Sequence, residues 1–137
     1  MDSIFNILFY FYICMSNEIL NPCPCGLPSA YEMCCQLAHR SLYNAKTAEQ
    51  LMRSRYTAFT KADGDYLMKS HHSSTRPLSE KKSIVKWAKS VEWVRLEILN
   101  TELGQEEDSL GSVEFKAYFK DKKREQFIHE NSKFIKE

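Results

Sequence analysis

Four cysteines stand within thirteen residues of this chain, and their spacing suits the binding of one metal ion. Cys23 and Cys25 flank Pro24, and the adjacent pair Cys34 and Cys35 follows after eight further residues. Thiols this close in sequence rarely reach disulfide geometry without strain, whereas two short knuckles can direct four sulfurs at one ion. We therefore predict a structural Zn2+ site with Cys23, Cys25, Cys34 and Cys35 as ligands, and buried cysteines without metal are the alternative.

The charge of such a site places demands on its surroundings. Four thiolates around Zn2+ leave two net negative charges, which backbone N–H groups and nearby cations must stabilise. Arg40 and Lys46 follow the cysteines in the chain and are candidates for this task. Closely spaced reduced thiols are also typical of a reducing compartment, so we expect a cytoplasmic protein.

Arg55 is the second candidate for chemistry, and it lies on a predicted helix that begins at Thr47. Thr47 and Gln50 form a capping box. Arg55 falls at about 40° on the helical wheel, inside an apolar arc of about 140°, whereas Arg53 falls at about 200°, outside it. A buried guanidinium needs a carboxylate or a bound anion, so Arg55 is expected inside the fold and Arg53 at its surface or rim. The apolar arc consists of Ala48, Leu51, Met52, Tyr56 and Phe59.

Weaker candidates for catalysis accompany Arg55. Tyr56 and Glu130 could form hydrogen bonds or transfer protons, and His129 or His71 could titrate beside them. We expect Arg55 and Glu130 to meet inside the domain, with His129 on the opposite face of its strand. An ion pair between Arg55 and Glu130 would make both structural, whereas an open cavity around Arg55 would favour a small carboxylate or phosphate ligand.

The order of the predicted elements favours an α+β fold. The helix from Thr47 is followed by a break at 62–65, a short helix over about 66–71 and a third helix from Ser79. Three strands then follow over 92–103, 113–119 and about 125–135. Helices followed by long antiparallel strands predict a curved antiparallel sheet with the helices packed on one face. In the first strand, alternation predicts one face made of Val94, Leu96 and Ile98 and another made of Trp93, Arg95 and Glu97.

Composition limits the functional classes. The 137 residues suffice for one domain with a short appended module, and 43% hydrophobic with 27% charged residues is typical of a globular protein. A net charge of +1 gives no electrostatic case for nucleic-acid binding. Residues 4–15 are apolar but shorter than the roughly 20 residues that span a bilayer, and they lack signal-peptide features. We therefore expect no membrane span, translation from Met15, and 1–15 as an extension.

Several of these motifs resemble known bacterial families. Cys-Pro-Cys-Gly followed by Cys-Cys resembles the SEC-C motif, a zinc-binding module named for the C-terminus of the SecA translocation ATPase, where it contacts SecB and ribosomes. The rest resembles the YchJ-like family of uncharacterised proteins, so the resemblance covers residues 21–137. It is carried by 47–56, by Ser74-Thr75-Arg76, by the segment from Trp87 to Trp93, and by 128–134.

The resemblance implies a SEC-C module over 16–40 and a cone-like, nuclear-transport-factor-two-like (NTF2-like) domain over 41–137. It carries the zinc ligands onto the four cysteines and implies a protein partner that contacts exposed Leu27, Pro28 and Tyr31. Leu27-Pro28 replaces the usual Ser-Gly of the family. Family members usually continue past the equivalent of Glu137 with a closing strand, so we expect the last strand of the sheet to be missing.

Two functions remain in competition. The first is a zinc-binding accessory or interaction protein whose cone domain serves as a scaffold or ligand sensor. The alternative is a binder of a small anionic ligand, or an isomerase, dehydratase or hydrolase, that uses a cavity around Arg55. We favour the first function and expect no enzymatic activity, because four protein ligands leave no open coordination position and no complete acid–base set is present.

Overall fold

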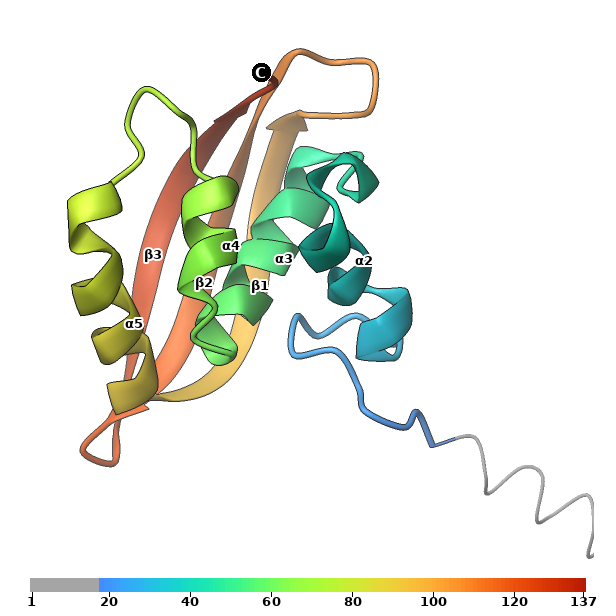
Figure 1. Ribbon diagram of the computed structural model, residues 1–137. Helices are drawn as coiled ribbons and strands as arrows, with labels where there is room; N and C mark the ends of the chain where they lie inside the picture. The colour runs from blue at the N-terminus through green and yellow to red at the C-terminus, as the bar shows by residue number, and fades with distance from the viewer. Residues whose placement is uncertain (1–17) are drawn as a thin grey trace, which may run out of the picture.

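A computed structural model describes residues 18–137, and the predictions for 1–15 and for Met15 lie outside them. The helices are α2 (Cys35–Arg40), α3 (Ala48–Thr60), α4 (Gly64–Lys69) and α5 (Lys81–Ser90), and the strands are β1 (Glu92–Leu103), β2 (Leu110–Asp121) and β3 (Arg124–Ile135) (Figure 1). Short 3-10 helices span Tyr31–Met33, Leu42–Asn44 and Leu78–Glu80. In this part of the chain no helix combines the length and apolar character needed to cross a bilayer.

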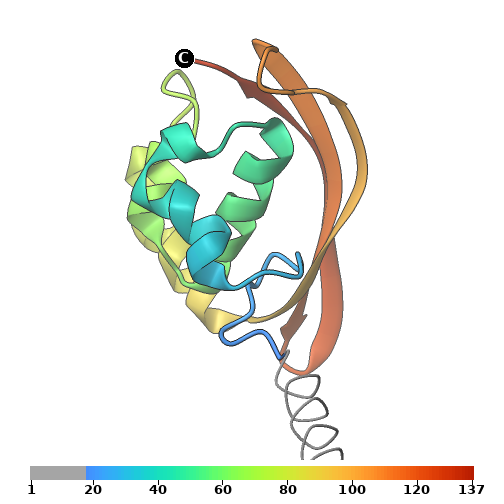
Figure 2. The ribbon, with the colours of Figure 1, turned by 90° about the vertical axis from the view of Figure 1, so that its right-hand side faces the viewer.

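The three strands form one antiparallel sheet in the order β1-β2-β3. Figure 2 shows that this sheet bends around the helical layer, with the helices on its concave side. Lys122 and Lys123 have φ angles of 50° and 65° and make the tight turn between β2 and β3. The α+β class predicted from the sequence, with a curved antiparallel sheet and helices on one face, is confirmed.

The predicted alternation of β1 is wrong at its start. The pairing of β1 with β2 shifts between Trp93 and Arg95, so Val94 has no partner across the ladder. Trp93 therefore joins Leu96 and Ile98 on the side that packs against the buried core, and Val94 is 41% exposed. The physical reason is a β-bulge, which inserts one residue and reverses the faces beyond it.

Helix α3 lies between the sheet and the other helices. Its capping box is confirmed, since the Gln50 N–H donates to the Thr47 hydroxyl (3.1 Å) and the Gln50 side chain accepts from the Thr47 N–H (3.2 Å). One side of α3 packs Met52 and Tyr56 against β2. The other side packs Ala58 against α4 and against Ala38 of α2. This central position lets α3 contact both the sheet core and the cysteine segment.

Candidate metal centre

Two short backbone turns present the four cysteines. The loop around Cys23 and Cys25 is closed by a hydrogen bond from the Cys23 N–H to the Ser29 carbonyl (2.9 Å), and the Gly26 N–H donates to the Cys23 carbonyl (3.2 Å). Gly26 has a φ of +90°, which a residue without a side chain adopts at little cost. Cys34 ends the 3-10 helix at Tyr31–Met33, and Cys35 begins α2. The loop and the helix start form the two expected knuckles.

The structure brings the four predicted cysteines together. Their Sγ atoms all lie within 4.8 Å of one another, and the sulfurs of Cys25 and Cys34 are 3.6 Å apart. A tetrahedral ion with metal–sulfur distances near 2.3 Å requires sulfurs about 3.8 Å apart. Three of the cysteines are buried, and Cys34 is half-buried. The cluster can therefore hold one metal ion, with every tetrahedral position filled by protein.

The thiols differ in their readiness to ionise. A hydrogen bond from Cys35 is the largest influence on Cys25 and lowers the pKa of its thiol to about 5. Burial raises the pKa of Cys34 to about 12, and the pKa of Cys35 is also raised, first by its hydrogen bond with Cys25. One thiolate is thus favoured by the protein alone, and a divalent cation is needed for all four to ionise.

Two residues of α3, Thr57 and Arg53, contact the segment that carries the cysteines. The hydroxyl of Thr57, a fully buried residue, lies 3.8 Å from the Cys23 sulfur, and its hydrogen bond lowers the pKa of Cys35 against the opposing influences. Arg53 donates from Nη1 to the Cys25 carbonyl (2.8 Å) and from Nε to Glu49 (3.0 Å). These contacts fix the loop that carries Cys23 and Cys25 onto the helix.

Arg53 was predicted to be a surface or rim residue, and it is half-buried at the rim of α3 rather than exposed. Its side chain is only 15% exposed, because the cysteine loop covers a face of α3 that the helical wheel alone marks as polar. Arg40 and Lys46 were the expected cations. Within residues 18–137, neither of their side chains forms a hydrogen bond or an ion pair with the cysteine loop.

His39 links the cysteine segment to α3, a role that sequence reasoning missed. Its Nε2 lies 2.8 Å from the Ser54 carbonyl and its Nδ1 lies 2.7 Å from the Tyr31 hydroxyl. Because a carbonyl only accepts, Nε2 donates and Nδ1 accepts from Tyr31. The sequence offered one signal, since His39 follows Cys35 by four residues and so shares its helix face.

Tyr31 differs from its predicted exposure. Its hydroxyl is bound by His39, and the ammonium group of Lys61 lies 4.1 Å from the centre of its ring. Tyr31 is therefore half-buried at the boundary between the cysteine segment and the helical layer, whereas Leu27 and Pro28 are exposed as expected.

Replacing Arg53 tests the support of the cluster. Arg53→Met should weaken metal affinity about 10- to 100-fold, the usual range for removal of an outer-shell partner, because the Cys25 loop loses its anchor. Competition with a chromophoric chelator measures the change. Arg95→Met, on the sheet face away from the helices, is the matched control and should bind metal as the unchanged protein does. Equal affinities for all three proteins would contradict the assignment.

Arg55 lies inside the fold but meets different partners from those predicted. Its Nη1 donates to the Leu67 carbonyl (2.9 Å) and to the Ser70 hydroxyl (2.6 Å) at the end of α4. Burial lowers the pKa of Arg55, and Glu130 opposes this only as a minor influence. Within residues 18–137, Arg55 makes no ion pair, so the expected pairing with a strand glutamate is not formed.

The other predicted candidates are dispersed. Glu130 is exposed on β3, and His129 binds Glu114 (2.9 Å) on the neighbouring strand. Tyr56 is buried against the sheet, and His71 contacts the Thr75 hydroxyl (3.1 Å) in the loop after α4. In the described part of the chain, no hydrogen bond joins any of these residues to another or to Arg55.

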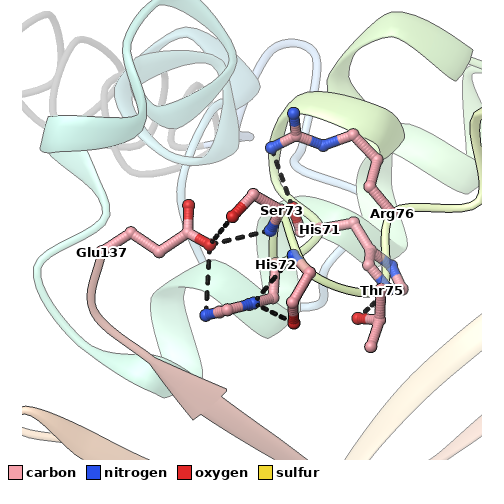
Figure 3. A network of polar contacts seen from close by, with 7 residues as sticks. His71, His72, Ser73, Thr75, Arg76 and Glu137 are labelled. Carbon is pink, nitrogen blue, oxygen red and sulfur yellow. Dashed lines mark hydrogen bonds and ion pairs between the residues drawn. The ribbon is translucent and has the colours of Figure 1, made fainter.

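The loop after α4 binds a carboxylate from the far end of the sheet (Figure 3). Glu137 accepts hydrogen bonds from the Ser73 N–H (2.7 Å) and hydroxyl (2.6 Å), and it lies 3.1 Å from His72 Nε2. These contacts with Ser73 lower the pKa of Glu137. The network fastens the segment that follows β3 to the helical layer.

Comparison with known proteins gives consistent matches. A family model described as the YchJ middle NTF2-like domain matches residues 47–137. A UPF0225 protein of Vibrio parahaemolyticus is 39% identical over 115 residues, which cover 84% of this chain and 68% of the relative. A UPF0225 protein of Geobacter sulfurreducens is 40% identical over 116 residues, covering 85% and 72%.

Two solved structures have the same fold. A SEC-C motif containing protein from Psychrobacter arcticus superposes with a TM-score of 0.73 at 36% identity, covering 85% of this chain and 72% of the other. A SEC-C motif containing protein from Rhodopseudomonas palustris gives a TM-score of 0.75 at 32% identity, covering 85% and 89%. Each comparison covers 85% of this chain, a larger share than residues 47–137 alone.

Proposed function

This chain belongs to the YchJ middle NTF2-like domain family, and on that premise we propose that it is an accessory protein whose four-cysteine module binds structural zinc and contacts a protein partner. The observation that carries the proposal is the closed set of four sulfurs within 4.8 Å of one another. Such a set folds and stiffens a short segment and leaves no position for a substrate.

Zinc is the ion that this donor set favours. Soft thiolate ligands in tetrahedral geometry suit Zn2+, and the solved relatives are named for the SEC-C motif. Cys23, Cys25, Cys34 and Cys35 would hold the ion, and Arg53 and Thr57 would stabilise the loop and the thiolates. A reducing compartment such as the cytoplasm would keep these thiols available for the metal.

The surface of the module supports a role in protein contact. Leu20 and Met33 are 85% and 72% exposed, and Ile19, Leu27 and Leu37 are exposed to a lesser degree. Large apolar side chains at a surface are normal singly, whereas a concentration of them marks interaction sites. We propose that the partner is a protein that covers Met33 and Leu20 with apolar side chains of its own.

Met33→Glu tests the contact without touching the metal ligands. This variant should retain about one zinc per chain, measured by elemental analysis, and should lose the protein that the unchanged chain captures from a bacterial lysate. The charge is expected to abolish capture because it cannot be desolvated against an apolar partner.

Leu78→Glu is the matched control for this experiment. Leu78 is 65% exposed and lies in the helical layer outside the module, so its charged variant should capture the partner normally. Capture by Met33→Glu, or equal loss in both variants, would contradict the contact. A folded module without zinc would contradict the metal assignment.

A further inference from the structure

A cavity of about 460 Å³ lies where the cysteine loop meets the helical layer and the sheet. The loop contributes one wall, the final residues of α3 and α5 contribute two more, the start of β1 forms the fourth, and the cavity opens broadly to solvent. A volume in this range accommodates a small organic molecule. Its principal lining residues are Pro24, Tyr56, Lys61, Lys89, Trp93 and Val94.

The charge of the lining is of one sign. Lys61 and Lys89 line the cavity, and no carboxylate does. Both lysines are exposed, and within residues 18–137 neither forms an ion pair. Lys61 directly follows the last turn of α3, and Lys89 belongs to the last turn of α5. Part of the charge of each lysine therefore offsets the negative end of its helix dipole. The remaining field attracts an anion to the cavity mouth.

Tyr56 provides a polar group at the same place. The residue is only 2% exposed, its ring packs edge-on against Trp93 with 5.8 Å between centres, and it lines the cavity. In residues 18–137 its hydroxyl forms no hydrogen bond with the protein, and its oxygen is not among the fully enclosed polar atoms without a partner, so it is accessible to a ligand. Burial raises the pKa of Tyr56 to about 12, so the hydroxyl keeps its proton and can donate.

The rest of the lining is apolar. Trp93 and Val94 on the sheet side and Pro24 on the loop side offer hydrocarbon surface. The indole N–H of Trp93 is already bound to the Ala88 carbonyl (3.1 Å), so Trp93 contributes only its apolar ring. Pro24 stands between Cys23 and Cys25, so the thiolates lie close to the loop side of the cavity. Their negative charge would repel a negative ligand group from that side.

From this arrangement we propose that the cavity binds a small organic carboxylate with an apolar body. The carboxylate lies toward Lys61 and Lys89, an acceptor oxygen receives the Tyr56 hydroxyl, and the apolar body rests on Trp93 and Pro24. This site differs from the predicted anion site at Arg55, whose guanidinium is occupied by α4. It also stands independently of the partner contact at Met33.

Titration of the full chain with phenylacetate, hexanoate and benzoate tests the site, with phenylacetamide as the uncharged match to phenylacetate. Nuclear magnetic resonance should show a saturable shift of the Trp93 indole N–H, assigned with a Trp87→Phe variant. Phenylacetate should bind about tenfold more tightly than phenylacetamide, which lacks the charge that the lysines attract.

Three variants connect the binding to named side chains. Tyr56→Phe keeps the ring and should weaken carboxylate binding about tenfold by removing one hydrogen bond to a charged group. Lys89→Gln should weaken it as well, whereas Lys86→Gln, on the same helix but outside the lining, should leave it unchanged. The proposal is overturned if no carboxylate shifts Trp93, if the amide binds equally well, or if Tyr56→Phe and Lys89→Gln bind like the unchanged chain.

Discussion

Cys35→Ser is expected to abolish metal binding and to unfold the cysteine module while leaving the sheet folded. Structural zinc in small modules contributes about 10–16 kcal/mol of binding free energy that is coupled to folding, and a hydroxyl is a poor replacement for a thiolate. Cys35 also begins α2, so the helix that carries His39 loses its anchored end. Elemental analysis should show a fall from about one zinc per chain to nearly none.

Amide hydrogen exchange locates the damage. Protection should disappear at the Cys23 and Cys34 N–H groups, whose bonds close the two knuckles, and should persist along β2. Cys14→Ser, the fifth cysteine, lies outside the described residues and is the matched control, since the four-ligand set is complete without it. Retention of zinc by Cys35→Ser, or an equal loss in Cys14→Ser, would show that the ligand set is different.

Arg55→Ala is expected to lower the free energy of unfolding by about 2–4 kcal/mol. The Leu67 carbonyl and the Ser70 hydroxyl lose their donor at the end of α4, and the buried side chain leaves a cavity. Urea denaturation followed by circular dichroism measures the change. Arg95→Ala removes an exposed arginine paired with Glu97 and should change stability by less than about 1 kcal/mol.

A second variant, Arg55→Lys, separates a structural role of Arg55 from a ligand-binding one. A structural arginine predicts that phosphate and small carboxylates raise the melting temperature of the unchanged chain and of Arg55→Lys by the same small amount. A large anion-dependent rise that disappears in Arg55→Lys, with little loss of stability in the absence of anion, would restore the anion-anchor hypothesis.

Local signals predicted much of the fold. The capping box at Thr47 fixed the start of α3, because two side-chain bonds determine a helix end regardless of what lies beyond it. Strand β1 covers the residues expected from period-2 alternation, and the four cysteines converge as their spacing indicates. Each of these features depends on residues only a few positions apart.

The remaining features depend on contacts that no short window contains. The helical wheel places Arg53 on the polar side of its helix, whereas in the structure the cysteine loop, 28 residues away in sequence, covers its side chain. His39 bonds to Ser54, which lies 15 residues further along the chain. No residue near Val94 indicates that the pairing register between β1 and β2 shifts there. The cavity at Tyr56 joins segments from four parts of the chain. These are consequences of packing, which a helical wheel or an alternation pattern cannot represent.

The simple strand order of the sheet also bears on how the chain acquires its structure. Each strand pairs only with its neighbour in sequence, so the sheet assembles from two successive hairpins with short loop closures. Pairing between strands that are neighbours in sequence costs little chain entropy, because the loops that must close are short. Because these strand pairings involve no cysteine, we expect the α+β domain to reach its native topology without the metal, with ion capture as a later step on a formed α3. Metal supply would then govern the module's assembly rather than the survival of the newly made chain.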